Sequence, residues 1–198
     1  WPPVVSAHLL GGAITIGLQF LIWRIIKTNT EPKWKSIWSA FAVVIFLQMA
    51  LGAWTSSHYA GLACPDFPTC QGRMWVEITS EVLHSPMVDG DEYLGGIGSN
   101  QQRMGIQWLH RLGALGVVLM FIFLAIKQST QRRALTLCFT LLSIQIVLGV
   151  LNAVLLLPLS LALLHNTFAM LLWMSAIHGM TTPELEEEND EIAQELLA

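Results

Sequence analysis

Three histidines lie inside long apolar segments of this 198-residue chain, each a few residues from one end of its segment. They are His8, His110 and His165. At about 1.5 Å of rise per helical residue, each would lie roughly 6–9 Å below the same membrane surface. A single histidine at that depth is most simply a hydrogen-bonded structural residue, because polar groups in lipid need a partner. Two at matched depth, on helices that both run in from the outer face, favour a different use, in which His110 and His165 bind a haem iron from both sides.

An arginine directly follows one of these histidines. Arg111 lies in the same apolar segment as His110, where a guanidinium needs an anion or a path to water. Haem propionates would serve, because arginine can bind a carboxylate through two parallel hydrogen bonds. Alternatively, the side chain extends to lipid headgroups or outer water. Small residues follow Arg111 in the sequence. They leave room equally for a flat macrocycle or for a close helix, and they are Gly113, Ala114 and Gly116.

Two cysteines, Cys64 and Cys70, follow the second apolar segment and enclose the sequence Pro-Asp-Phe-Pro-Thr. On the oxidising side of a membrane such a pair favours a disulfide, and the prolines restrict the backbone between them. The disulfide could be structural or redox-active, and the residues alone favour the structural role. Metal binding is disfavoured, because the loop contains no further cysteine.

The other histidines and the third cysteine have simpler interpretations. His58 and His84 are irregularly spaced and are expected to be interfacial residues, and His178 is expected to be a polar residue at a helix end. Cys138, in the middle of an apolar segment, is expected to be a packing residue.

Composition indicates what must position these residues. Hydrophobic residues make up 54% of the chain and charged residues only 12%, against about 25% charged residues in soluble domains. Membrane-spanning helices need about 20 apolar residues. The fold class predicted is therefore all-α integral membrane, with five transmembrane helices at Val4–Ile26, Ile37–Tyr59, Gly105–Ile126, Ala134–Leu157 and Leu159–His178.

Charge sets the predicted orientation. Short loops rich in Lys and Arg stay on the cytoplasmic side, and two such loops contain Arg24, Lys27, Lys33 and Lys35, and Lys127, Arg132 and Arg133. Residues 60–104 form an acidic loop, which is placed outside. Residues 181–198 form an acidic, solvated tail, which is placed inside. Basic residues are not interleaved with aromatic ones, so nucleic acid is not an expected partner.

A faint repeat divides the chain. Gln48–Gly52 and Gln145–Gly149 share the pattern Gln-x-x-Leu-Gly, and each precedes by one segment a membrane histidine, His110 or His165. His8 lacks such a preceding segment. We therefore expect four helices to form an up-down haem-binding bundle, plus one orphan helix from a preceding bundle.

The expected domains follow from this division. Residues 1–27 would be the last transmembrane helix of a truncated N-terminal bundle, and 28–180 a C-terminal four-helix bundle with the outer loop 60–104. Residues 181–198 would be the cytoplasmic tail. Because the first residue is Trp1 rather than Met, the chain is expected to be a fragment.

Longer motifs resemble the haem A synthase family. The order and spacing match over nearly the whole chain up to about residue 180. The stretches that carry the resemblance are Trp1–Gly12, Leu51–Gly72, Gln107–Ala114 and Leu157–Asn166.

The resemblance implies eight helices in two similar bundles, and oxidation of the methyl group of haem O to the formyl group of haem A. His110 and His165 would be axial ligands of a haem b cofactor, and His8 a ligand of the haem iron in the other bundle. Cys64 and Cys70 match loop cysteines for which a disulfide is implied. The site residues expected in this way are His110, His165, His8 and Arg111 for haem, with Cys64 and Cys70 as a possible redox disulfide.

One departure from the family pattern assigns the bundle its role. The family places a glutamate three residues before a ligand histidine of the other bundle, and Gln107 occupies the corresponding position before His110. A neutral amide cannot act as a carboxylate base. The bundle is therefore expected to hold a cofactor, and no catalytic residue is assigned in this chain.

The expected protein is a membrane oxidoreductase of the inner (cytoplasmic) membrane, multi-pass, with loop 60–104 in the periplasm. Expected partners are membrane lipid, haem O as substrate, haem O synthase and cytochrome oxidase assembly factors, and an oligomer is compatible with the sequence. The chain alone is expected to be inactive, because half of the substrate pocket is absent.

Two other functions stay open at this point. One is a membrane b-type cytochrome that only transfers electrons, and the other is a quinone-linked thiol oxidoreductase that uses Cys64 and Cys70. A purely structural membrane protein leaves the depth-matched histidines and Arg111 unexplained.

Overall fold

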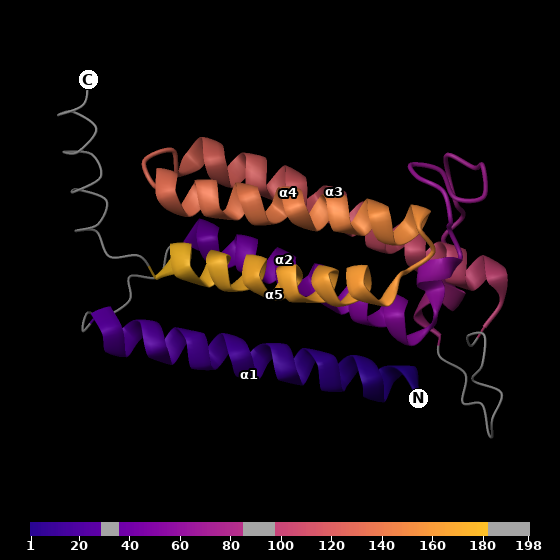
Figure 1. Ribbon diagram of the computed structural model, residues 1–198, viewed down its shortest axis with the longest axis horizontal. Helices are drawn as coiled ribbons and strands as arrows, with labels where there is room; N and C mark the ends of the chain where they lie inside the picture. Colours follow the sequence, from indigo (N-terminus) through magenta and orange to yellow (C-terminus); the bar gives the residue numbers. More distant parts are fainter. Residues whose placement is uncertain (29–35, 85–97, 182–198) are drawn as a thin grey trace.

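Five long helices make up most of the computed structural model, which describes residues 1–28, 36–84 and 98–181 (Figure 1). They are α1 (Pro2–Thr28), α2 (Ser36–Ser57), α3 (Asn100–Lys127), α4 (Arg132–Val154) and α5 (Leu159–Met180). Two short 3₁₀ turns, η1 (Ala60–Leu62) and η2 (Ser80–Leu83), lie in the loop after α2. Each of the five helices is long and apolar enough to span a membrane, and the described residues contain no strand. The predicted all-α membrane fold is confirmed.

Helix ends differ from the prediction where polar contacts decide them. α3 begins at Asn100, five residues before the predicted Gly105, because the Ser99 side chain accepts a hydrogen bond from the Gln102 backbone N–H at 3.1 Å. The Gln102 side chain then donates to the carbonyls of Glu81 and His84, at 2.6 and 2.7 Å. The outer loop therefore holds this first turn of α3, and hydropathy does not predict such contacts.

Two other helices end earlier than predicted. α2 stops at Ser57, because Tyr59 has a φ of 53°, and α4 stops at Val154, because Leu156 and Leu157 have φ values of 60° and 58°. Left-handed backbone at a non-glycine residue ends a right-handed helix. Both chain reversals therefore begin two to three residues inside the apolar segments.

α2, α3, α4 and α5 form an antiparallel four-helix arrangement, with α1 beside α2 and α5 (Figure 1). α2 packs against α3 and α5, α4 packs closely against α5, and α3 touches α4 only lightly. Within the described parts of the chain, α3 and α5 do not pack against each other, so they lie diagonally across the bundle. The assignment of α1 to a preceding bundle stays a prediction.

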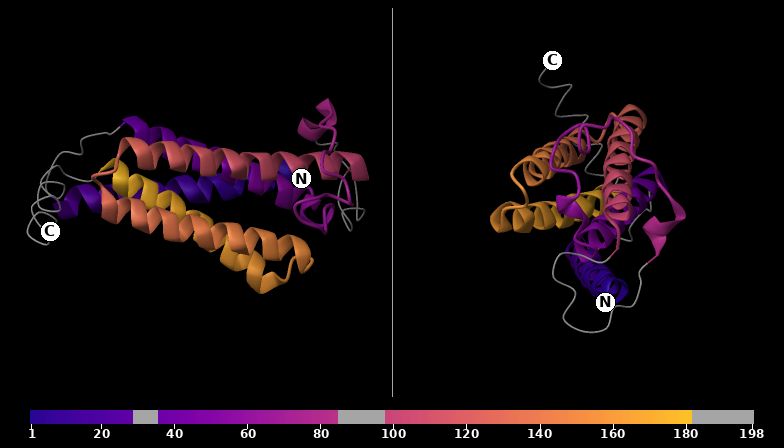
Figure 2. Two further views of the ribbon diagram at one scale, coloured as in Figure 1. Left: turned by 90° about the horizontal axis from the view of Figure 1, so that it is seen from above. Right: turned by 90° about the vertical axis from the view of Figure 1, so that its right-hand side faces the viewer.

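The apolar core occupies one half of the bundle. Its fully buried members come from the beginnings of α2 and α4 and the ends of α3 and α5, and they include Trp38, Phe41, Leu124, Cys138 and Ala176. In the other half, no residue of α5 between Leu159 and Leu171 is buried. Figure 2 (left) shows the α4–α5 hairpin diverging from α3 toward the end that carries the outer loop. The half with the membrane histidines is therefore the less tightly packed half.

α1 contacts the bundle through a narrow face. Ser6 Oγ lies 3.0 Å from Ser57 Oγ, and Arg24 donates to the Thr181 carbonyl at 3.5 Å near the opposite end. Between them, a Cβ at Gly17 would collide with the Trp173 ring, so glycine permits this close approach. The remaining large apolar side chains of α1 are mostly exposed, which suits a helix bordered by lipid or by further helices.

Several predicted features lie outside the described residues. Of the acidic tail, only Thr181 is described, where it follows α5. Lys33 and Lys35 of the first basic loop lie outside the described ranges, as does the segment 85–97 of the outer loop.

Candidate functional site

His110 and His165 occupy the loosely packed half of the bundle. His110 comes from α3 and His165 from α5, the two helices that lie diagonally opposite each other, and both side chains are half-buried. Each imidazole contacts the helix that precedes its own in the chain. The structure therefore places in one half of the bundle the two histidines that were paired from depth alone, while their role as ligands stays a prediction.

A glutamine from the neighbouring helix contacts each imidazole. Gln48 of α2 places its Nε2 atom 3.1 Å from His110 Nδ1 and donates to the His110 backbone carbonyl at 2.9 Å. Gln145 of α4 places its Nε2 atom 3.2 Å from His165 Nε2. The two contacts have the same residue types and the same helix order, but they involve different imidazole nitrogens.

A glycine lies four residues after each glutamine, on the same helix face. A Cβ at Gly52 would lie 3.3 Å from His110 Cε1, and a Cβ at Gly149 would lie 3.2 Å from His165 Cε1. Both values are tighter than ordinary van der Waals contact, so an alanine at either position would press on the imidazole. In each Gln-x-x-Leu-Gly segment, the glutamine amide and the glycine therefore both contact the histidine.

Sequence analysis detected this pattern as a repeat and missed what it contacts. Helix spacing puts Gln and Gly on one face, but the face that meets a particular histidine depends on how two helices are aligned. The signal that pointed to it was the recurrence of the motif one helix before each histidine.

Gly113 permits the close approach of a helix, α2, which is one of the two uses predicted for it. A Cβ there would collide with the Gln48 side-chain oxygen and crowd Leu51, so the missing side chain accommodates the carboxamide that contacts His110. Nothing lies within 4 Å of a Cβ built at Gly116, which leaves open space beside α3 at that position.

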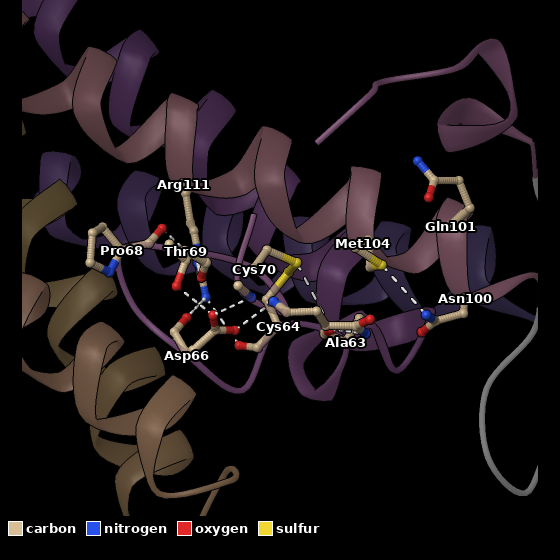
Figure 3. The surroundings of a disulfide bond; sticks show 12 residues. Ala63, Cys64, Asp66, Pro68, Thr69, Cys70, Asn100, Gln101, Met104 and Arg111 are labelled. Atoms are coloured by element: carbon tan, nitrogen blue, oxygen red, sulfur yellow. Dashed lines mark hydrogen bonds between the residues drawn. A yellow bond between two sulfur atoms is a disulfide. The ribbon is translucent and has the colours of Figure 1, made fainter. Parts of the chain in front are cut away.

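Arg111 points into the outer loop (Figure 3). Nη1 donates to the carbonyls of Pro68 and Thr69, at 3.2 and 2.7 Å, and Nη2 donates to those of Cys64 and Asp66, at 3.0 and 2.9 Å. The partner predicted from the sequence was a haem propionate or, alternatively, lipid headgroups or outer water. The observed contacts give the guanidinium a different use, because both terminal nitrogens hold the loop. A propionate would have to bind the Nε–H, which makes no hydrogen bond to a described residue, or share a terminal nitrogen that is already engaged.

The loop that Arg111 holds is closed by a disulfide. Cys64 and Cys70 are bonded, with Cα atoms 4.5 Å apart, and both side chains are fully buried (Figure 3). The predicted disulfide is present, and its burial favours the structural role, because thiol exchange requires access to a sulfur.

The Asp66 carboxylate organises the same loop. It accepts hydrogen bonds from the Thr69 hydroxyl, from the Gln71 N–H at 2.6 Å and from the Gly72 N–H at 2.9 Å. These bonds, led by the one from Thr69, lower the pKa of Asp66 to about 2. The carboxylate therefore fixes the turn that follows the disulfide.

If the disulfide is structural, the isolated protein should contain no thiol at Cys64 or Cys70. We expect neither residue to react with a maleimide before denaturation and reduction, and both to react afterward. Mass spectrometry of the labelled peptides measures this, with Cys138, buried and 3.1 Å from Ser175 Oγ, as an internal reference for a protected thiol. Labelling of both loop cysteines in native protein without reductant would contradict the expectation.

The remaining candidates are dispersed. His8 is exposed on α1, on the side away from the bundle contacts of Ser6 and Gly17, so it is not part of the His110–His165 pair. His58 was expected to be interfacial but is fully buried, with Nδ1 2.9 Å from the Trp54 carbonyl and its ring tilted at 45° against the Trp54 indole.

Three further residues that the sequence singled out lie elsewhere in the bundle. Gln107 is buried, and its Oε1 atom has no hydrogen-bond partner among the described residues. Cys138 is a packing residue, as predicted. His178 lies in the last turn of α5, at the end of the bundle opposite the histidine pair.

Five apolar helices, a diagonal histidine pair and a disulfide-closed loop define a multi-pass membrane protein built around a histidine-containing helical bundle. A family model described as cytochrome oxidase assembly protein, COX15-CtaA, matches residues 1–177. The chain belongs to this family, as the motifs predicted.

Curated relatives agree with this assignment. The chain is 34% identical to the heme A synthase of Shewanella oneidensis over 187 residues, which cover 89% of the chain and 57% of that relative. It is 27% identical to the heme A synthase of Beijerinckia indica over 190 residues, covering 88% of the chain and 50% of the relative. The corresponding protein of Cereibacter sphaeroides is 28% identical over 160 residues, 77% of the chain and 40% of the relative. The chain thus spans about half the length of the curated relatives it matches.

Proposed function

We propose that the bundle of α2, α3, α4 and α5 binds haem b between His110 and His165, as the electron-transfer part of a haem A synthase. The observation that carries the proposal is the placement of two imidazoles on diagonal helices, each held by a glutamine and faced by a glycine. When bound, haem b would supply one-electron redox chemistry.

The residues present fit a haem. The facing sides of the bundle are incompletely buried where the two histidines lie, while the core fills the other half. His110 engages Gln48 through Nδ1, and its Nε2 has no hydrogen bond to any described residue, so this nitrogen is available to an iron. Among the described residues, no three His, Cys, Asp or Glu side chains gather as a bare metal ion would need, which favours a haem iron with two imidazoles.

The chain would contribute binding, orientation and shielding to the reaction. His110 and His165 would hold the iron, Gln48 would orient His110, and the loop held by Arg111 would cover the outer end and limit water there.

We propose that the whole protein oxidises the methyl group of haem O to the formyl group of haem A in the membrane. Relatives named heme A synthase support this activity. His8 faces away from the histidine pair, which supports a second haem site on the far side of α1, where haem O would bind. The neutral Gln107 supports a cofactor role for the bundle described here.

The proposed orientation places the disulfide loop in the periplasm and the opposite end of the bundle in the cytoplasm of a bacterial inner membrane. Described basic residues support it, since Arg24, Lys27, Lys127, Arg132 and Arg133 all lie near the end away from the disulfide (Figure 1). Membrane lipid and haem O are the partners that this placement requires, and haem O synthase would supply the substrate.

A reduced-minus-oxidised absorption spectrum with a pyridine haemochrome assay tests the cofactor site first. We expect a low-spin b-type spectrum with about one haem for each pair of axial imidazoles. Well-folded protein without haem would refute the site. Chromatography of haems after incubation with haem O tests the activity, because an electron-transfer cytochrome would show the spectrum and form no haem A.

A further inference from the structure

Gln48 is fixed against His110 by two contacts from one nitrogen. The His110 carbonyl can only accept a hydrogen bond, so the atom 2.9 Å from it must be the amide nitrogen of Gln48. The same nitrogen lies 3.1 Å from His110 Nδ1, which therefore accepts, and the single proton of a neutral imidazole lies on Nε2.

The carboxamide oxygen of Gln48 takes no part in these two contacts. Gln48 Oε1 is buried and has no hydrogen-bond partner among the described residues, and it lies against the space that Gly113 leaves. A buried acceptor without a donor destabilises a fold, so such an atom calls for an explanation.

Ligation of an iron supplies one. A neutral imidazole that binds metal through Nε2 carries its proton on Nδ1, and that proton is normally donated to an acceptor. On His110 the proton would move from Nε2 to Nδ1. Gln48 Oε1 is an acceptor on the side chain that already touches Nδ1. A rotation of the carboxamide would present Oε1 to Nδ1 and turn Nε2 away from both Nδ1 and the His110 carbonyl.

We propose that Gln48 is a positioning residue for His110, which holds the imidazole from its Nδ1 side and accepts the Nδ1 proton when Nε2 binds the haem iron. This inference rests on the proposed function, in which His110 is an axial ligand. A hydrogen bond accepted from Nδ1 makes the imidazole a stronger electron donor, which favours ferric over ferrous iron. Gln48 would therefore lower the reduction potential of the haem.

Gln145 provides a matched comparison in the other hairpin. Its amide nitrogen contacts Nε2 of His165, the nitrogen through which iron would bind. Gln145 Oε1, like Gln48 Oε1, and His165 Nδ1 are buried with no hydrogen-bond partner among the described residues. Gln145 cannot keep this contact once Nε2 is ligated. The two glutamines thus share residue type and motif position, but only Gln48 is placed to act on a ligated imidazole.

The test measures the haem midpoint potential and the low-spin ferric EPR spectrum of detergent-purified protein carrying haem b. Gln48→Leu is expected to raise the potential and shift the EPR g values. Gln48→Glu retains an acceptor of the same reach and is expected to lower the potential. Gln131→Leu, a buried glutamine at the far end of the bundle, is expected to change neither, and Gln145→Leu is expected to change the potential less than Gln48→Leu.

The outcomes separate this inference from the proposed function. Wild-type protein without low-spin haem refutes both. Wild-type protein with low-spin haem, and the same potential and g values in both Gln48 variants, leaves the haem site standing and overturns the inference. If Gln48→Leu binds no haem, Gln48→Glu decides: a lowered potential supports the inference and an unchanged one overturns it. A shift in Gln145→Leu as large as in Gln48→Leu would also overturn it.

Discussion

Replacing either His110 or His165 with alanine is expected to abolish the low-spin haem b spectrum of the purified protein. Each imidazole comes from a different helix of a diagonal pair. Among its described residues, the bundle offers no other histidine at that level that could replace either one. Loss of one axial ligand leaves an iron that cannot be six-coordinate through two imidazoles. The reduced-minus-oxidised spectrum and the haem-to-protein ratio measure the effect.

His178→Ala is the matched control for these variants. His178 lies on the same helix as His165 but in its last turn, at the opposite end of the bundle. The control should keep the wild-type spectrum and haem content. Low-spin bands that persist in both His110→Ala and His165→Ala would remove the axial assignment, provided circular dichroism shows that the helices are intact.

Replacing Arg111 with lysine is expected to loosen the disulfide loop despite the conserved charge. The guanidinium donates to four loop carbonyls, and an ammonium at the end of a flexible stem cannot reach all four with one geometry. Hydrogen bonds to charged groups contribute about 1.5–3 kcal/mol each, and water would replace part of the loss at this outer surface. We expect a net loss of about 3 kcal/mol in the local opening free energy, or roughly 100-fold faster amide exchange.

Hydrogen–deuterium exchange of the peptides that cover residues 63–73 measures this change. Arg132→Lys is the control, because Arg132 is an exposed arginine at the far end of the bundle. It should leave exchange in the loop unaltered. Wild-type exchange rates in Arg111→Lys would show that the carbonyl contacts do not hold the loop. An effect confined to haem content would instead favour the propionate role first considered for Arg111.

Sequence alone predicted the parts of this molecule that depend on one helix at a time. Long apolar runs gave the five helices, because length and hydropathy are local properties. The depth of His110 and His165 could be counted from the ends of their segments. The early start of α3 could not, since it depends on contacts from Gln102 to loop carbonyls about twenty residues away in the chain.

The parts that were missed depend on how elements meet. The sequence left Gly113 open between a macrocycle and a close helix, and only the structure shows that the helix is α2 and that the Gln48 carboxamide occupies the space. Arg111 was given an external anion, yet its partners are backbone carbonyls, which every residue carries and no sequence pattern marks. His58 was expected at the interface, because the turn and loop that bury it are apparent only in three dimensions.

The Asp66 turn bears on how the outer face of the protein tolerates acid. An unperturbed aspartate is half protonated near pH 4, but Asp66 has a pKa of about 2, because the Thr69 hydroxyl and two backbone N–H groups donate to its ionised form. Its contribution to stability is therefore complete above the ordinary aspartate value and is lost only as the pH falls through about 2. In mildly acidic surroundings Asp66 therefore stays ionised, and the turn that follows the disulfide keeps the hydrogen bonds that fix it.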